Sequence, residues 1–172
     1  MIREIITYPN KLLFKKSQKV TKFDNELHQL LDDMYETMIS SNGIGLAAVQ
    51  VGVLLEVIVI NLADENGIQD KANLLELINP KIAQKTGEQI YQEGCLSVPG
   101  FFEEVKRAKN ITLEYFDRFG KAQILTADEL LSVAIQHEMD HLDGHLFIEK
   151  IGYNARKRFD KEFRKNKKSS KK

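Results

Sequence analysis

The residues with the clearest capacity for chemistry lie at positions 136–144, where the sequence reads Gln-His-Glu-Met-Asp-His-Leu-Asp-Gly. His137 and His141 are four residues apart in a segment with helical periodicity, so both imidazoles project from one helix face and can hold one metal ion. Glu138 stands beside the first histidine, where a carboxylate can take a proton from water at the metal and return it to a leaving group. The pattern is H-E-x-x-H, and a polar helix surface is the equally weighted alternative.

Cys95 is the single cysteine of the chain and lies in residues 93–100. Gly94 and the pair Pro99-Gly100 predict an exposed, turned loop at this point. A single thiol cannot form an internal disulfide and suits a reducing cytosol. The thiol is inert, reactive or a metal ligand, and as a ligand it would complete a Cys-His-His site. The 42 residues that separate it from His137 do not show that the two meet.

A third stretch, residues 43–52, is small and almost uncharged. It lacks the Lys-Ser/Thr pair of a P-loop and the full glycine spacing of a dinucleotide-binding turn. Gly43 and Gly45 would allow another backbone to approach closely, and Gln50 is a neutral hydrogen-bond donor in an apolar run. A tight, packed turn is the alternative interpretation.

Two helices are expected to position these residues. The first follows Asp24, which can cap it, and should end near residues 41–43, where Asn and Gly tolerate the left-handed conformation. Residues 126–129 form a capping-box pattern that should begin the helix carrying the histidines, and Gly144 should end that helix. The first helix has an apolar stripe at helical spacing, made of Leu27, Leu30, Leu31, Met34, Tyr35 and Met38.

Strands are expected between these helices. Residues 54–62 form a β-rich run typical of a well-buried strand, and residues 74–79 predict a second strand that Pro80 ends. One or two more strands are expected in residues 81–92, around Gly87. Residues 117–120 predict the loop of a hairpin whose strands lie in residues 105–116 and 121–126.

Composition places the chain among globular proteins of about one domain, with 172 residues, 42% hydrophobic and 29% charged. No apolar run approaches the roughly 20 residues that span a bilayer, and residues 1–6 lack the features of a signal peptide, so we expect no membrane association and no export. We expect one catalytic domain over residues 1–152, with residues 153–172 adding a basic helix and a disordered tail to the same domain.

Net charge is zero but unevenly distributed, since residues 155–172 contain ten basic and two acidic residues. A helix is expected over residues 153–168, with Phe159 and Phe163 docking it to the body and a basic face turned outward. Such a face would bind phosphates without base specificity and with strong salt dependence. A solvated tail that aids solubility is the alternative. The basic residues concerned are Arg156, Lys157, Arg158, Lys161, Arg164 and Lys165.

Taken together, residues 43–50, 93–97 and 136–141 resemble the three signature motifs of peptide deformylases, in the same order. The resemblance runs from the Asp24 helix through Gly144 into a C-terminal helix of the kind that bacterial members carry. It implies a cytoplasmic enzyme that removes the formyl group from the N-terminal formylmethionine of nascent polypeptides, and it favours ribosomal RNA as the partner of the basic helix.

The same resemblance implies residue roles. Cys95, His137 and His141 would hold the metal, and Glu138 would move the proton from water to the leaving amine. Charge on the formyl oxygen would be met by the metal, the Gln50 side-chain amide and the Leu96 backbone N–H. Ligand softness favours Zn2+ in such a site, whereas the resemblance favours Fe2+ as the native ion, with Ni2+, Co2+ or Zn2+ able to replace it. We expect iron as the working ion.

Substrate contacts and a supporting ion pair are also expected. Apolar residues one to two turns before His137 predict a pocket for the methionine side chain, and the peptide beyond it should add as a strand. A carboxylate beside such a pocket needs a partner, which predicts an ion pair of Glu93 with Arg107; two solvated charges are the alternative. The pocket residues are Leu130, Val133 and Ala134, and the strand would pair with Gly43, Ile44 and Gly45.

Two other protein classes compete with this interpretation. A zinc endopeptidase of the metzincin type needs a third histidine at position 147, which is Phe147 here, and a glutamate ligand could only be Glu149 or Glu162. A binding module with a structural metal needs a fourth protein ligand, for which His145 is the nearest candidate.

The fold that we expect is α+β. Antiparallel and mixed strands would wrap around the helix of residues 126–144, which carries H-E-x-x-H. The helix after Asp24 would pack outside, and a C-terminal helix would lie at the edge.

Overall fold

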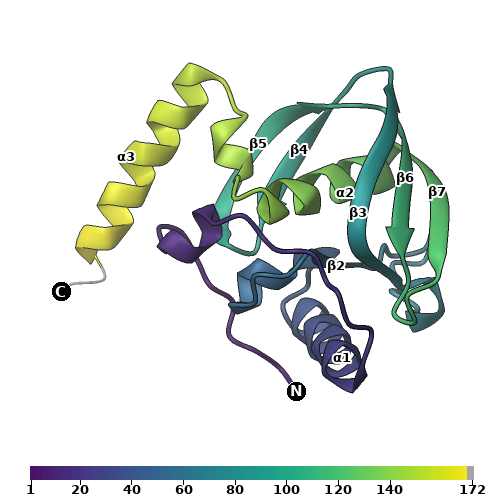
Figure 1. Ribbon diagram of the computed structural model, residues 1–172. Coiled ribbons are helices and arrows are strands. Elements are labelled where there is room, and N and C mark those ends of the chain that lie inside the picture. Colours follow the sequence, from purple (N-terminus) through teal and green to yellow (C-terminus); the bar gives the residue numbers. More distant parts are fainter. Residues whose placement is uncertain (170–172) are drawn as a thin grey trace.

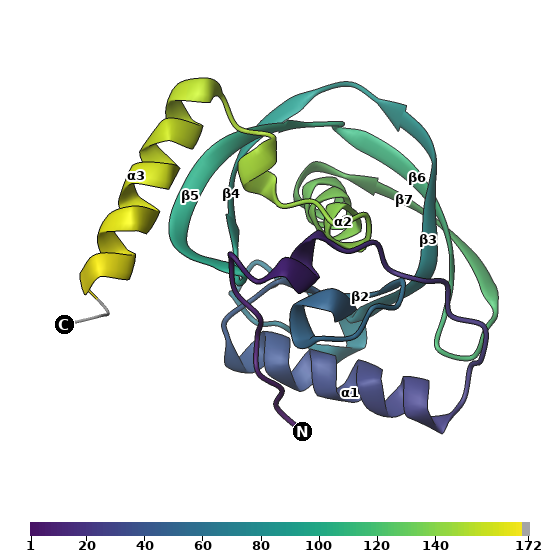
Figure 2. The same ribbon diagram turned by 60° about the vertical axis from the view of Figure 1, so that its left-hand side comes forward.

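The computed structural model describes residues 1–169 and has helix α2 (Glu129–Leu142) at its centre, with two antiparallel sheets curving around it (Figures 1 and 2). Helix α1 (Asn25–Ser40) packs outside this arrangement, and helix α3 (Tyr153–Ser169) stands at the edge beside β5. This is the predicted α+β fold. All strand pairs are antiparallel, so the mixed pairing that we also allowed is limited to one isolated parallel bridge, Gln18 with Leu55.

The larger sheet has five strands in the order β1-β2-β3-β6-β7, and the smaller sheet pairs β4 with β5. Strand β1 is therefore an edge strand, hydrogen-bonded to β2 on one side. The strands are β1 (Gly45–Ala47), β2 (Val57–Ile60), β3 (Leu75–Thr86), β4 (Gln89–Cys95), β5 (Val98–Arg107), β6 (Asn110–Phe116) and β7 (Ala122–Asp128). Short 3-10 helices span Lys11–Phe14, Ala48–Val51, Lys71–Asn73 and Phe147–Glu149.

Helix α1 forms as its sequence predicts. The Asp24 carboxylate accepts a hydrogen bond from the Leu27 N–H, which satisfies one free donor of the first turn. Asn42 has a φ of 54°, and the Gly43 N–H returns to the Met38 carbonyl, so the chain leaves the helix where predicted. The buried side of the helix contacts β1 and β2 and consists of Leu27, Leu30, Leu31, Met34 and Met38, with Tyr35 half-buried.

The hairpin of β6 and β7 is confirmed with its loop at residues 117–120, but its first strand begins at Asn110, since residues 105–107 belong to β5. The Asp117 carboxylate accepts hydrogen bonds from the backbone N–H groups of Phe119 and Lys121, and Gly120 has a φ of 77°. All four residues of β2 are buried, which explains why residues 54–62 contain a continuous apolar run instead of an alternating one.

Strand β3 corrects one expectation, because Pro80 does not end it. The strand continues to Thr86, and its register with β6 shifts between Ile78 and Lys81. Asn79 lies at this bulge with a φ of 50°, and its side chain both accepts a hydrogen bond from the Val20 N–H and donates one to the Val20 carbonyl. A bulge tolerates a residue that has no N–H to donate.

The start of α2 corrects another expectation. Strand β7 continues through residues 126–128, and Asp128 stands at the cap position without a side-chain hydrogen bond to the helix. The capping-box interpretation of residues 126–129 is therefore wrong, because pairing with β6 keeps Thr126 extended. The helix ends as predicted, with Gly144 at a φ of 80°. Residues 132–138 are all buried, so α2 is a core helix that carries polar side chains into the interior.

Helix α3 is attached by aromatic contacts. Phe159 is buried and packs against Phe101 of β5, and Tyr8 contacts both Phe159 and Phe163. Arg158 pairs with Glu103 of β5. The predicted basic helix is present through Ser169, and the part of the expected disordered tail at residues 170–172 lies outside the described residues. Within residues 1–169, no helix has the length and apolar character needed to cross a membrane.

Substitution of Gly144 by alanine should destabilise the fold through backbone geometry. An added Cβ would lie 2.7 Å from the carbonyl oxygen of Phe14, and the φ of 80° is left-handed. Gly67 is a matched control, since its φ is 78° and nothing lies within 4 Å of its added Cβ. Urea unfolding should show a loss of about 1 kcal/mol for Gly67→Ala from the left-handed conformation alone. Gly144→Ala should lose more than twice as much, and equal losses would contradict the predicted clash.

Candidate metal centre and active site

The structure brings together three side chains that the sequence separates. Ligand atoms of Cys95, His137 and His141 all lie within 4.8 Å of one another, and the Cys95 sulfur is 3.3 Å from Nε2 of His141. Cys95 is the last residue of β4, and the two histidines lie one turn apart on α2. Within residues 1–169 this is the one group of three or more such side chains arranged closely enough to hold a metal ion.

Cys95 lies in a tight turn between two strands, which corrects the expectation of an exposed loop. It pairs across the turn with Val98, the first residue of β5. Ser97 is fully buried, its hydroxyl donates to the Ile6 carbonyl at 2.7 Å, and its own carbonyl accepts from the Tyr8 N–H. The N-terminal segment therefore covers the turn, a contact between residues about 90 positions apart that local sequence cannot indicate.

His137 is oriented by a buried ion pair. Its Nδ1 lies 2.7 Å from Oε1 of Glu93, so Nδ1–H donates to the carboxylate and Nε2 is free to face the thiol. Both Glu93 oxygens accept from Arg107, at 2.7 and 2.8 Å. The two side chains are buried together instead of being solvated. Burial alone would raise the pKa of Glu93, but hydrogen bonds from Arg107 and His137 outweigh it and hold the pKa below its usual range.

The donor set fits a divalent cation. Burial favours the neutral form of His137, yet the adjacent Cys95 and Glu93 raise its pKa well above the ordinary value, which indicates an excess of negative charge around it. Burial lowers the pKa of His141, so this imidazole stays neutral, the form that binds metals, and its Nδ1 has no hydrogen-bond partner in the described structure. A thiol and two imidazoles are suitable ligands for a borderline-soft ion.

Glu138 is buried beside this cluster with one oxygen, Oε2, lacking a hydrogen-bond partner among the described residues. Burial raises its pKa to about 7. The backbone of β1 packs directly against it, because a Cβ on Gly45 would lie 2.6 Å from Oε1. A carboxylate with a pKa near neutrality can both accept and donate a proton at the pH of a cell.

Gln50 lies next to the thiol and is fixed by three contacts. Its Oε1 accepts from the Ala47 N–H at 2.9 Å, and its Nε2 donates to the Ser97 hydroxyl at 3.1 Å and lies 3.7 Å from the Cys95 sulfur. One amide N–H of Gln50 is therefore used by Ser97, which leaves the other N–H for the side of Nε2 that lies near the Cys95 sulfur. Leu96 is half-buried next to Cys95 and lines the same cavity.

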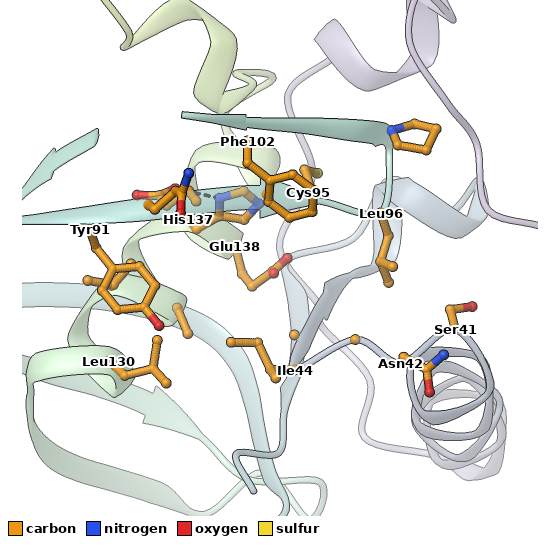
Figure 3. A pocket seen from close by; sticks show the side chains of 18 of the residues that line it. Ser41, Asn42, Ile44, Tyr91, Cys95, Leu96, Phe102, Leu130, His137 and Glu138 are labelled. Carbon is orange, nitrogen blue, oxygen red and sulfur yellow. Dashed lines mark hydrogen bonds and ion pairs between the residues drawn. The ribbon is translucent and has the colours of Figure 1, made fainter. Parts of the chain in front are cut away.

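A cavity of about 470 Å³ leads to the cluster. In Figure 3, the side chains of His137 and Glu138 lie close together in its lining, and those of Tyr91, Leu130 and Ile44 lie further from the histidine. The structure brings the expected pocket and strand residues together in its lining, namely Gly43, Ile44, Gly45, Leu130, Val133 and Ala134. Sequence reasoning missed Tyr91 and Phe102. Strand alternation could have indicated Tyr91, which is two residues before Glu93 on β4. Nothing in the sequence indicated Phe102.

The residues required by the competing classes lie elsewhere. His145 is exposed and its Nδ1 lies 3.2 Å from Glu149, which also accepts from the Leu146 N–H. Glu162 is exposed on α3. None of the three belongs to the group of close ligand atoms in residues 1–169. The described structure therefore provides neither a fourth protein ligand from His145 nor a glutamate ligand from these positions.

Two imidazoles, a thiol and a buried carboxylate at the end of an apolar cavity define the kind of site that hydrolytic enzymes use. The family model of polypeptide deformylase matches residues 2–157. The chain belongs to this family, and its class is accordingly that of a hydrolase.

Individual relatives are similar over the whole chain. The peptide deformylase of Campylobacter jejuni is 61% identical over 173 residues, covering 100% of this chain and 99% of the relative. That of Nautilia profundicola is 54% identical, covering 95% and 94%. Among solved structures, the peptide deformylase from Legionella pneumophila superimposes with a TM-score of 0.90 at 38% identity, covering 100% of this chain and 99% of the other.

Replacing Glu138 should change how the stability of the metal-free protein depends on pH. Its folded pKa of about 7 exceeds the ordinary 4.5, so the favourable contribution of this group is complete below pH 4.5 and is lost as pH rises through 7. Glu138→Gln should therefore unfold like the parent near pH 4.5 and be more stable at pH 8, by up to about 3 kcal/mol. Glu65→Gln, on an exposed turn, controls for lost charge. No gain at pH 8 would contradict the predicted burial cost.

Proposed function

We propose that this protein removes the formyl group from the N-terminal formylmethionine of newly made polypeptides and releases formate. The observation that carries the proposal is the buried Glu138 carboxylate beside the cluster of Cys95, His137 and His141, in a chain of the deformylase family. Action on nascent chains is consistent with a cytoplasmic location.

Cys95, His137 and His141 would hold one divalent ion. The softness of the donor set favours Zn2+, whereas the family resemblance favours Fe2+, and we take Fe2+ as the native ion with Ni2+, Co2+ or Zn2+ able to replace it. Such an ion, when bound, supplies Lewis acidity that polarises a carbonyl and lowers the pKa of water. Glu93 would keep His137 in the tautomer that presents Nε2 to it.

Glu138 would carry the proton through the reaction. Its Oε2 accepts a proton from the attacking water as the water oxygen bonds to the formyl carbon. The same oxygen then gives this proton to the amide nitrogen, so that the C–N bond breaks, the peptide leaves as an amine and the formyl carbon leaves as formate. Burial raises the pKa of Glu138 and a bound cation would lower it, and these opposing effects suit a group that must both accept and return a proton.

Gln50 and Leu96 would stabilise the developing charge on the formyl oxygen. The Gln50 amide is held with its oxygen on the Ala47 N–H and one N–H on the Ser97 hydroxyl, so the second N–H would be directed to the cluster before substrate arrives. The Leu96 backbone N–H, next to Cys95, would be the second donor.

The cavity would select methionine and accept many following residues. Leu130, Val133 and Ala134 would surround the unbranched methionine side chain. The peptide would add as a strand at the free edge of β1, pairing with the backbone at residues 43–45. Main-chain hydrogen bonds of this kind give affinity with little sequence preference.

Formate release from a formyl-Met peptide tests the proposal directly, in protein purified without oxygen. Glu138→Gln should retain the metal and lose several orders of magnitude in turnover, because it cannot move the proton. Cys95→Ser or His141→Ala should instead lose the metal, as measured by elemental analysis. Near-normal turnover of Glu138→Gln, or no formate from the parent protein with metal bound, would contradict the proposed function.

Helix α3 would dock on ribosomal RNA through phosphate contacts. Phe159, Phe163, Arg156 and Arg158 face the body, since Arg156 donates to the Ile148 carbonyl and Arg158 pairs with Glu103. We infer from these contacts that helix α3, residues 153–169, belongs to the same domain as residues 1–152. An outward basic face remains on the exposed side of the helix, made of Lys157, Lys161 and Arg164 at spacings of four and three residues.

Removing the charge of this outward face should weaken binding to the ribosome without changing the rate of deformylation of a short peptide. The triple change of Lys157, Lys161 and Arg164 to Gln keeps the contacts that attach α3, so activity on a short peptide should stay unchanged. Co-sedimentation with ribosomes should fall at least tenfold at low salt, where phosphate contacts are strongest. A matched triple change of the exposed Lys19, Lys22 and Lys121 to Gln controls for net charge. Equal ribosome binding by the two triple variants would contradict docking through α3.

A further inference from the structure

A second cavity, of about 420 Å³, lies behind the Glu93–Arg107 ion pair. Glu93 lines the cavity that leads to the cluster, and Arg107 lines the second one, so the pair forms the wall between them. The second cavity has no thiol or imidazole, and its charged groups are largely paired with one another. Its informative feature is Asp140, an acidic residue on α2 for which neither the sequence nor the proposed mechanism supplied a role.

Asp140 contacts the ion pair directly. Its Oδ2 accepts a hydrogen bond from Nη1 of Arg107 at 2.6 Å, while Nε and Nη2 of the same guanidinium hold the two oxygens of Glu93. The other oxygen of Asp140 lies 3.4 Å from the ammonium of Lys150. Arg107 is almost fully buried, with 4% of its side chain exposed, whereas Asp140 is 20% exposed and faces the second cavity.

These contacts join the two elements that carry the ligand atoms. Glu93 is on β4, two residues before Cys95, and it also holds His137. Asp140 is on α2, immediately before His141. Arg107, on β5, thus binds β4 through the hydrogen bonds of Nε and Nη2 to Glu93 and binds α2 through the hydrogen bond of Nη1 to Asp140. A guanidinium fixes such a geometry better than an ammonium, because its donors are held in one plane.

The charges show why the second carboxylate is needed. A buried guanidinium requires compensation, and both Glu93 and Asp140 favour its charged form against the cost of burial. If Asp140 lost its charge, Arg107 would keep Glu93 but lose its hold on α2. Near the cluster, the strand with the thiol and the helix with the imidazoles would then be joined through the contact of Glu93 with His137 and that of Cys95 with His141.

We propose that Asp140 is a positioning residue for the metal centre: by holding Arg107 from α2, it sets how closely the Cys95 thiol approaches His137 and His141. The proposal rests on the proposed function, in which these three residues hold the ion. Lys150 supports Asp140 from the exposed side, so its contribution is smaller and is screened by salt.

Cobalt-loaded protein provides the test, with two readouts that do not depend on turnover. The first is the rate at which a chelator removes Co2+, and the second is the visible absorption of the bound cobalt, which reports the arrangement of its ligands. Asp140→Asn should release cobalt at least about tenfold faster and shift the absorption bands, the size of effect seen when outer partners of metal ligands are removed. Asp140→Glu, which keeps the charge, should restore much of the retention.

Asp143→Asn is the matched control. Asp143 lines the same cavity and lies near the same end of α2, but it pairs with Lys16 and not with Arg107. It should release cobalt at the parental rate. Lys150→Gln should speed release roughly two- to threefold at low salt and have no effect at high salt. If Asp140→Asn does not fold, Lys150→Gln and Asp140→Glu carry the test.

A double-mutant cycle identifies the route of the effect. If Asp140 acts through Arg107, then Arg107→Lys and Asp140→Asn should each speed release, and the double variant should be little worse than the more severe single one. Parental release and an unchanged spectrum for Asp140→Asn, or an equal effect of Asp143→Asn, would overturn the proposal while leaving the proposed function intact. A parent protein that binds no cobalt would overturn both.

Discussion

The burial of ionisable side chains on α2 is the constraint on which the rest of the structure depends. The helix is surrounded by sheet, so every polar group that it carries inward must find a partner. Gln136 bonds to both the N–H and the carbonyl of Ala108, and His137 bonds to Glu93. Among the described residues of α2, the buried side-chain atoms without a hydrogen-bond partner are Nδ1 of His141 and Oε2 of Glu138, and the Cys95 sulfur lies against the other ring nitrogen of His141. A cation held by the thiol and the two imidazoles would place positive charge beside the buried Glu138 carboxylate, so the site and the fold share one physical explanation.

Two glycines on the surrounding strands allow close packing around the cavity that leads to the cluster. A Cβ on Gly45 would meet the Glu138 carboxylate at 2.6 Å, and a Cβ on Gly94 would meet the Phe102 ring at 2.4 Å. The absence of a side chain at Gly45 lets β1 pack against Glu138, and its absence at Gly94 leaves room for the Phe102 ring, which lines the same cavity. Strand β1 has a free edge, and Gly45 of this strand lines the cavity, so the peptide that we propose as substrate would meet unpaired backbone groups there.

Local signals in the sequence were sufficient for the elements that depend on local contacts. The stripe and cap of α1, the hairpin around Gly120 and the end of α2 at Gly144 were predicted from spacing and turn chemistry. The meeting of Cys95 with the histidines required the resemblance to a family, since 42 residues of intervening sequence do not reveal a contact. The errors at Pro80, at residues 126–129 and at the Cys95 turn each arise where distant partners override local preference: Val20 at the bulge, β6 beside Thr126 and Ile6 over Ser97. Asp140 was missed for the same reason, because its partner is 33 residues away.

The central claim is that one thiol and two imidazoles hold a single divalent ion. X-ray absorption spectroscopy at the edge of the bound metal, on protein prepared without oxygen, measures this ligand set directly. We expect one sulfur and two imidazole nitrogens and no further protein ligand. The sulfur contribution should be absent from the spectrum of any metal that Cys95→Ser retains. A shell without sulfur, or one with a third imidazole from His145, would contradict this claim.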